Sequence, residues 1–173
     1  VEDCTSRGHA GLGLHPGSGS QRPAMRNNKL ADNDIGIFFC WGVKYGLAEG
    51  NQIRNCRLGV SIGHRDTDNL VVNNDIDGSG QAGVLFRPER GPGFCGHRNV
   101  IEKNRITNSG GESGIGIDIQ GGTESITLRS NTIRETRSPA ARIGIRLGKE
   151  TKEITLAENK IEGVKSDVVD LRA

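Results

Sequence analysis

The sequence predicts an all-β protein, a parallel solenoid of about seven coils with three strands in each coil. A first pattern, glycine followed by an apolar, a variable and an apolar residue, starts at Gly11, Gly36, Gly59, Gly83, Gly116 and Gly144, and residues 168–171 repeat it without the glycine. A second pattern, Asn-x-apolar, starts at Asn28, Asn51, Asn74, Asn104, Asn131 and Asn159. The glycine precedes the asparagine by 15 residues in four of six repeats, which indicates a fixed structural unit.

Three short strands are predicted in each repeat, in a constant order. The first follows the glycine, the second contains the apolar residue three positions before the asparagine, and the third begins at the asparagine. Alternating apolar residues indicate strands, and no helical pattern lies between them. We therefore expect the repeats to stack, with each strand about 4.8 Å from its copies. The second-strand residues are Met25, Ala48, Val71, Ile101, Leu128 and Leu156.

Three inward columns of apolar side chains are expected to form a long, thin core. Burial of each side chain contributes roughly 1.5–3 kcal/mol, enough to explain folding although only 33% of residues are hydrophobic. The stacked asparagines are expected to hydrogen-bond to one another, and the glycine to allow a sharp turn before the first strand. The columns are Leu12, Ile37, Val60, Val84, Ile117, Ile145, Val169; Leu14, Phe39, Ile62, Phe86, Ile119, Leu147, Leu171; and Leu30, Ile53, Ile76, Ile106, Ile133, Ile161.

Composition narrows the classes of function. The length suits one domain spanning residues 1–173, and the net charge of +2 argues against a nucleic-acid-binding arm. No run of 18 apolar residues occurs, so no membrane partner is expected. The cysteines form no CxxC pair, which predicts no metal site of that kind, and we interpret them as small buried residues: Cys4, Cys40, Cys56 and Cys95.

The Gly-Ile-x-Ile and Asn-x-Ile copies resemble the right-handed parallel β-helix superfamily of pectate-lyase-like proteins, over about residues 1–171. The resemblance implies three parallel sheets, a substrate groove outside the first strands, and a secreted or cell-surface bacterial protein that associates with a polysaccharide or oligosaccharide. Members usually have more coils and an N-terminal capping helix. Here the chain starts at Val1 without them, so we expect a fragment of a longer solenoid, or open coils covered end to end or by oligomerisation.

Four insertions flank the expected groove and mark where a site is expected, because loops vary while the stacked core does not. They span residues 16–23, 87–97, 108–113 and 135–142. Dense charge is expected at one corner, from His64-Arg65-Asp66 and from Arg87-Pro88-Glu89-Arg90. A solvated, salt-bridged turn is the simplest interpretation of this charge. The functional interpretation makes it a catalytic patch of His64, Arg87, Asp66 and Glu89, with His15, Trp41, Arg65, Asp118 and Arg146 binding substrate.

Each proposed binding residue has a structural alternative. Trp41 is expected to be either a sugar-stacking platform or a buried turn residue. Asp118 lies in register with Arg146 and forms either an exposed ion pair or part of a fork that binds a uronate. His15 and His97 lie in insertions, where either is a candidate proton-transfer group.

Two classes of function remain open. In an enzyme acting as a lyase, His64 or Arg87 removes the proton next to a uronate carboxyl while Arg65 or a bound Ca²⁺ neutralises charge. A glycoside hydrolase needs two carboxylates instead, with Asp66 paired either with Glu89 or with Asp118. The alternative is a non-catalytic structural or glycan-binding surface module. No resident cofactor is expected, with Ca²⁺ kept as the alternative for a lyase.

Overall fold

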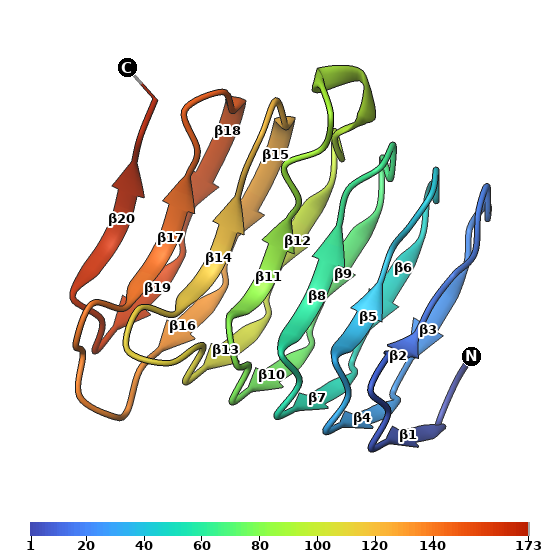
Figure 1. Cartoon of the computed structure of the whole chain (residues 1–173), viewed down its shortest axis with the longest axis horizontal. Helices are drawn as coiled ribbons and strands as arrows, with labels where there is room; N and C mark the ends of the chain where they lie inside the picture. The colour runs from blue at the N-terminus through green and yellow to red at the C-terminus, as the bar shows by residue number, and fades with distance from the viewer. Residues whose placement is uncertain (173) are drawn as a thin grey trace.

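The computed structural model describes residues 1–172 and confirms the predicted all-β, right-handed parallel β-helix of about seven coils. Three parallel sheets run along the long axis, and like strands of successive coils lie side by side (Figure 1). The first sheet contains the strands with the glycine pattern, β2 (Leu12–Leu14), β5 (Ile35–Phe38), β8 (Leu58–Ile62), β11 (Ala82–Phe86), β14 (Ile115–Ile119), β17 (Ile143–Leu147) and β20 (Ser166–Asp170).

The other two sheets are built from the second and third predicted strands of each coil. The second sheet contains β3 (Ala24–Arg26), β6 (Leu47–Glu49), β9 (Leu70–Val72), β12 (Val100–Glu102), β15 (Glu124–Arg129) and β18 (Lys152–Ala157). The third contains β1 (Thr5–Arg7), β4 (Lys29–Ala31), β7 (Gln52–Arg54), β10 (Asp75–Asp77), β13 (Arg105–Thr107), β16 (Thr132–Arg134) and β19 (Lys160–Glu162). The short 3₁₀ segment η1 (Pro92–Phe94) follows β11.

The core columns are confirmed in the middle coils and wrong in register at the two ends. Ile37 pairs with Val60 and Val60 with Val84, as predicted, and these side chains are fully buried. In the first coil, however, Leu14 and not Leu12 lies beside Ile37. In the last coil, Val168 and not Val169 lies beside Ile145. The first error arises because the sequence offers two glycines, Gly11 and Gly13, and only the second belongs to the glycine column.

The glycine column serves close packing and not the predicted sharp turn. Gly36 lies inside β5, and its φ is not in the left-handed region. A Cβ placed on Gly36 would lie 2.6 Å from the carbonyl oxygen of Gly59 and 2.6 Å from Cγ2 of Ile53. Such distances are well inside van der Waals contact. Glycine is therefore required because the next coil and the third sheet leave no space for a side chain.

The predicted asparagine ladder is confirmed at the turn before the third sheet. The backbone N–H and the Nδ2 of Asn51 both donate to Oδ1 of Asn74, each over 2.9 Å. Nδ2 of Asn51 also donates to the carbonyl oxygen of Met25 in the preceding coil. The same pattern links all six members: Asn28, Asn51, Asn74, Asn104, Asn131 and Asn159.

The interpretation of the four cysteines as small buried residues is confirmed for two of them. Cys56 and Cys95 are buried, whereas Cys40 is half-buried and Cys4 is exposed, and all four are free thiols. Cys4 lies at the first position of the asparagine column, where its N–H donates to Oδ1 of Asn28.

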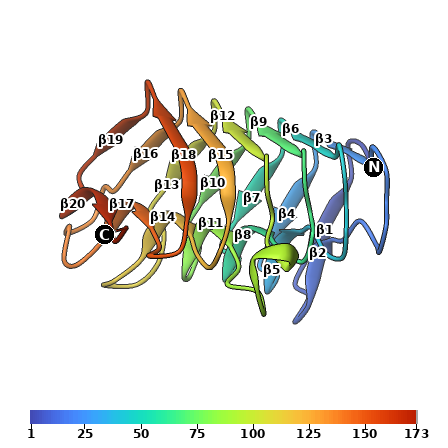
Figure 2. The ribbon, with the colours of Figure 1, turned by 90° about the horizontal axis from the view of Figure 1, so that it is seen from above.

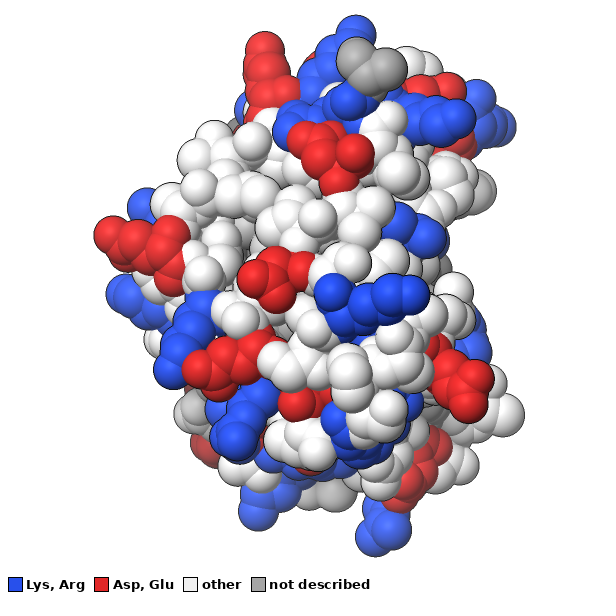
Figure 3. Space-filling view, turned by 90° about the vertical axis from the view of Figure 1, so that its left-hand side faces the viewer, with Lys and Arg blue, Asp and Glu red and all other residues white. Residues whose placement is uncertain are grey.

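Charges of both signs are interspersed over the end that carries β20 (Figure 3). Within residues 1–172, no helix has the length and apolar character needed to cross a membrane.

The insertion at residues 87–97 stands out beyond the turns of the neighbouring coils, where it carries η1 (Figures 1 and 2). It folds back on the turn of the preceding coil, because the N–H of Arg65 donates to the carbonyl oxygen of Phe94 over 2.8 Å. This contact places the insertion against the corner where the first sheet ends.

Candidate functional site

An aromatic cleft lies at the corner after the first sheet, between the turns of four successive coils. The indole of Trp41 stacks on the imidazole of His64, with ring centroids 4.6 Å apart and planes 22° from parallel. The ring of Phe94 meets the same imidazole edge-on at 5.9 Å. The cleft has a volume of about 320 Å³, and its lining comprises Ser18, Trp41, Gly42, His64, Arg65 and Arg90.

The turns that carry these side chains adopt an uncommon backbone conformation. Trp41 has φ of 83°, His64 of 46° and Arg65 of 66°, all in the left-handed region that bulky residues rarely occupy. Positive φ also occurs at turns of the other coils, for example at Asn55 and Asn73, so it is a feature of the repeating turn and does not by itself mark a site. Trp41 is 57% exposed, so the indole is held in place and still open to a ligand.

Asp66 fixes the two turns from beneath the cleft. Its side chain is fully buried. Oδ1 accepts the N–H of Val43 over 3.0 Å, and Oδ2 accepts the N–H of Gly63 over 3.1 Å. Burial raises the pKa of Asp66 to about 6, although these backbone hydrogen bonds and the charge of Arg87 oppose the rise.

Arg87 links the next coil to the same corner. Its Nη1 donates to Oγ of Ser61 over 2.8 Å and its Nη2 to the carbonyl oxygen of Phe39 over 3.1 Å. Nε donates to Oε1 of Glu89 over 3.1 Å, and Nη2 lies 3.5 Å from Oδ2 of Asp66. Because its donors bind protein groups, Arg87 holds neighbouring coils together.

The second oxygen of Glu89 faces the aromatic cleft. Oε2 of Glu89 lies 3.4 Å from Nδ1 of His64, and both side chains are largely buried. A carboxylate on Nδ1 favours the tautomer with its proton on Nδ1 and leaves Nε2 as an acceptor. The pair therefore has the form of an imidazole base oriented by a carboxylate.

Two cations share one aromatic ring at the edge of the cleft. The guanidinium carbons of Arg65 and Arg90 lie 4.1 and 3.8 Å from the centroid of Phe94. Neither arginine forms an ion pair with an acidic group of residues 1–172, whereas Arg87, Arg98 and Arg146 do. Sequence reasoning missed Phe94, for which the insertion at 87–97 was the only signal. It included Arg90 in the charged stretch at residues 87–90 but gave it no role of its own.

Asp118 and Arg146 lie together, as the sequence predicted, but away from the aromatic cleft. The two residues are register partners on β14 and β17, and Arg146 donates two hydrogen bonds to the carboxylate, over 2.9 and 2.6 Å. The Asp118 side chain is only 4% exposed, so the pair is not the exposed one of the structural alternative. Hydrogen bonding to Asp118 raises the pKa of Arg146. Arg146 instead lines a separate cleft of about 330 Å³ with Pro88 and Gln120.

The two histidines of the insertions are placed differently. His15 is exposed and its ring lies 5.2 Å from that of Phe38, on the outer face of the first sheet. Nδ1 of His97 accepts the N–H of Glu124 and its Nε2 lies 2.8 Å from the carbonyl oxygen of Pro92. Both ring nitrogens of His97 are thus occupied, which suits a structural role.

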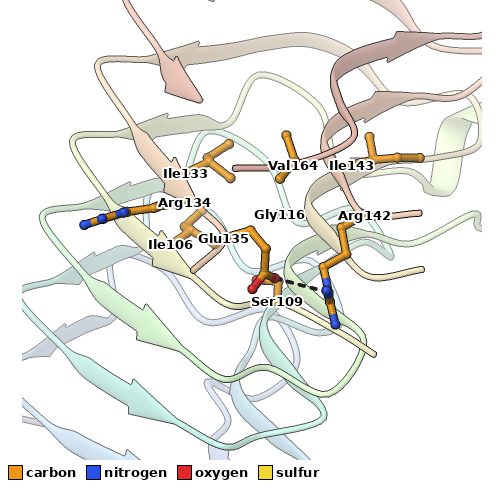
Figure 4. A pocket seen from close by; sticks show the side chains of 9 residues that line it. All are labelled: Ile106, Ser109, Gly116, Ile133, Arg134, Glu135, Arg142, Ile143 and Val164. Carbon is orange, nitrogen blue, oxygen red and sulfur yellow. Dashed lines mark ion pairs between the residues drawn. The ribbon is translucent and has the colours of Figure 1, made fainter. Parts of the chain in front are cut away.

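Glu135 and Arg142, the two ends of the insertion at residues 135–142, form a buried ion pair (Figure 4), whereas residues 136–141 between them are exposed. Glu135 lies 3.2 Å from Nε of Arg142, and both side chains are nearly buried. Burial opposes ionisation, but the hydrogen bonds from Arg137 outweigh it and lower the pKa of Glu135. The adjoining cavity of about 10 Å³ has room for one water at most.

The fold defines the chain as a parallel β-helix protein, and its surface carries a cleft lined by aromatic rings and arginines. The family model described as "Periplasmic copper-binding protein (NosD)" matches residues 4–172, so the chain belongs to the NosD family. No functionally curated protein matches it.

Solved structures show the same architecture. The periplasmic alginate epimerase AlgG superposes with a TM-score of 0.68 at 16% identity, over 91% of this chain and 44% of AlgG. A mutant of AlgG gives a TM-score of 0.65 at 15% identity, over 96% of this chain and 46% of the mutant. At this identity the likeness shows the fold alone. The chain spans less than half the length of these structures.

The side chains present do not fit the copper of the family name. Copper sites use thiolate, thioether and imidazole ligands. Met25, the only methionine, lies in the core, Cys56 and Cys95 are buried, and both nitrogens of His97 are hydrogen bonded. Among residues 1–172, no three His, Cys, Asp or Glu side chains lie close enough to hold one metal ion. No chemical step is therefore assigned to copper.

Proposed function

We propose that the chain binds an acidic polysaccharide in the cleft of Trp41, His64, Arg65 and Arg90. The observation that carries the proposal is the pair of arginines without acidic partners, Arg65 and Arg90, held on Phe94 beside an exposed, stacked indole. An indole face suits the apolar face of a sugar ring. Guanidinium groups bind carboxylates through paired donors. Together these groups would recognise a sugar that carries a carboxylate.

The family description and the superposed structures support the proposal that the chain binds an acidic polysaccharide. The superposed AlgG structures are described as a periplasmic alginate epimerase, and the family description also names a periplasmic protein. We infer that this chain likewise works outside the cytoplasm of a bacterium, where acidic polysaccharides occur. The separate cleft beside Arg146 is a candidate for further sugar units of the same polymer.

The test is a binding assay with polyuronates, such as alginate or polygalacturonate, against a neutral glucan. We expect binding to the polyuronates alone, and a loss of binding of about tenfold or more in Trp41→Ala and in the double variant R65Q/R90Q. Tyr45→Ala is the matched control, because Tyr45 is another exposed aromatic residue, 53% exposed, that does not line the cleft. Equal binding of wild type and R65Q/R90Q would overturn the proposal.

A second candidate function is catalysis in the same cleft. The contact between His64 and Glu89 favours it, because an oriented imidazole can remove the proton next to a uronate carboxyl. We assign the neutralisation of the developing charge to Arg65 and Arg90 rather than to Ca²⁺. Asp66 has no part in the chemistry, because both of its oxygens accept backbone N–H groups.

Catalysis is tested with the same polyuronates in deuterated water. A lyase would release unsaturated products, and an epimerase would exchange the sugar proton for deuterium. We expect His64→Gln to abolish either signal while polymer binding persists. Wild type that binds polyuronate, shows neither signal and releases no new reducing ends, which a hydrolase would release, is a non-catalytic glycan-binding module.

A further inference from the structure

The two arginines that line the cleft lie on opposite faces of one aromatic ring. The guanidinium carbons of Arg65 and Arg90 lie over the ring of Phe94, 4.1 and 3.8 Å from its centroid. Two planar guanidinium groups so close to one centroid would overlap if they shared a face, and their like charges would repel. One arginine therefore occupies each face. The two guanidinium carbons are at most about 8 Å apart, with the ring between them.

The backbone of the insertion holds this arrangement in place. The carbonyl oxygen of Phe94 accepts the N–H of Arg65 over 2.8 Å, and Nε of Arg65 donates to the carbonyl oxygen of Gly93 over 3.3 Å. The N–H of Phe94 donates to the carbonyl oxygen of Gly91 over 2.9 Å and closes the turn. The spacing of the two positive charges is therefore a property of the folded insertion and needs no ligand to set it.

One carboxylate has no position from which it reaches both arginines. In a paired contact between a guanidinium and a carboxylate, the two central carbons lie about 4 Å apart. The points at that distance from both guanidinium carbons lie close to the midpoint between them, and the ring of Phe94 occupies this midpoint. Arg65 and Arg90 can therefore bind only two separate anionic groups.

The two positive charges favour a ligand that brings both anionic groups at once. Their separation is similar to the Debye length of about 8 Å at physiological ionic strength, so salt screens their mutual repulsion only in part. A ligand with one anionic group on each arginine offsets this repulsion. Because a single uronate ring carries one carboxylate, such a ligand contains at least two uronate units.

We propose that Phe94 is a positioning residue that spaces Arg65 and Arg90 so that they bind the carboxylates of two different units of one oligouronate. This role rests on the proposed function and adds to it the smallest ligand, which has two uronate units, and the residue that selects it. In the catalytic alternative, only one of the two arginines neutralises the charge on the reacting unit, while the other holds a second unit in place.

The first test compares the affinities of the wild type for galacturonate and for its linear dimer and trimer, measured by titration calorimetry. We expect affinity to rise by about tenfold or more from the monomer to the trimer, because the second carboxylate binds in an intramolecular step. The methyl-esterified trimer is the ligand control, since it keeps the sugar rings and lacks the charges. It should bind no more tightly than the monomer. Equal affinity for monomer and trimer, or an ester that binds as tightly as the acid, would overturn the proposed role of Phe94.

Single variants show whether the two arginines bind separate groups. We expect Arg65→Gln and Arg90→Gln each to lower trimer affinity by about tenfold and the double variant by about a hundredfold, because independent contacts add in free energy. Arg22→Gln is the matched control. Arg22 lies over the ring of Tyr45 in a similar contact, 5.4 Å from its centroid, and does not line the cleft. A double variant no weaker than the single variants would show that the arginines share one carboxylate.

Phe94→Leu tests the spacing itself. Leucine keeps an apolar side chain but lacks the flat ring that separates the guanidinium groups, so the trimer should lose its advantage over the monomer while the monomer still binds. Phe94→Tyr retains the ring and should retain the advantage. Equal losses for monomer and trimer in Phe94→Leu would indicate a general structural role and refute the assignment. If Phe94→Leu does not fold, the wild-type series and the arginine variants decide the question.

The length series also separates failure of this role from failure of the proposed function. Absence of binding to the polymer and to every oligomer would overturn both. Binding to the polymer without a preference for the trimer over the monomer would overturn the role of Phe94 alone, and the proposed function would stand.

Discussion

The side-chain amide of Asn51 donates to the side-chain oxygen of Asn74 over 2.9 Å, and the backbone N–H of Asn51 shares the same acceptor. Asn74 itself donates to the carbonyl oxygen of Ala48 and to Asn104. One buried amide thus satisfies polar groups in the coils on either side. Buried polar groups are costly without partners, so the middle of the ladder should be very sensitive to substitution.

We expect Asn74→Ala to destabilise the fold by about 3 kcal/mol or more, because it removes the acceptor of the buried backbone N–H of Asn51 and also the hydrogen bonds that join the Asn74 side chain to Nδ2 of Asn51, to the carbonyl oxygen of Ala48 and to Asn104. Chemical denaturation measures the change. Asn159→Ala is the matched control at the half-buried last member of the ladder, where a smaller loss is expected. Equal losses at the two positions would contradict a cooperative ladder.

The glycine column should tolerate no side chain. Gly36→Ala would place Cβ 2.6 Å from the carbonyl oxygen of Gly59, so we expect a loss of stability of about 1–3 kcal/mol or more. Gly17→Ala is the control, because nothing lies within 4 Å of its added Cβ. A shifted denaturation midpoint in Gly36→Ala alone is the expected result. No shift in either variant would show that the coils can separate locally.

The ion pair of the buried Asp118 and the half-buried Arg146 should matter more than exposed pairs. Arg146→Ala leaves a nearly buried carboxylate with only Gln120 as partner, and we expect it to cost about 2 kcal/mol of stability. Arg98→Ala breaks a geometrically similar but exposed pair with Asp68 and should cost under about 1 kcal/mol. Denaturation of both variants at one pH provides the comparison. Equal costs would argue that burial of Asp118 has no energetic effect.

Asp66 should reduce stability at neutral pH. Its pKa is raised from 3.8 to about 6 in the folded protein, so between these values the folded state binds more protons than the unfolded state. Stability from this group is therefore present below about pH 4 and is lost as pH rises through about 6, by up to roughly 3 kcal/mol. The difference in unfolding free energy between wild type and Asp66→Asn, measured across this range, should fall with rising pH. A constant or rising difference would contradict the assigned burial.

The fold was predictable because stacking imposes the same spacing and residue types on each coil. Asn51 and Asn74 illustrate this, since identical side chains at a fixed interval form one column. The register failed at Leu12 and Leu14 because Gly11 and Gly13 both satisfy the short pattern, and only the packing against Gly36 distinguishes them.

The candidate site was predictable only in outline. Its corner was indicated by the charges near His64 and Arg87, whereas the contact of His64 with Glu89 was not predicted, since the sequence paired Glu89 with Asp66. The insertion at 87–97 has no equivalent segment in the other repeats with which it could be compared, so the position of Phe94 could not be inferred. The same insertion covers Asp66, and a pattern of residue types does not show that a charged residue is enclosed.

From Asn51 to Asn131, the side-chain oxygen of each rung accepts hydrogen bonds from the coil before it, and the rung donates both to the asparagine of the coil after it and to a carbonyl oxygen of the coil before it. The side of a coil that contacts the preceding coil therefore differs from the side that contacts the following coil. Either side is complementary to the opposite side of any other coil. Whole coils are interchangeable modules, which gene duplication or engineering can add or remove without altering the joints. A partial coil has no matching face and must bulge outward, so new functional segments can enter this architecture only at its corners.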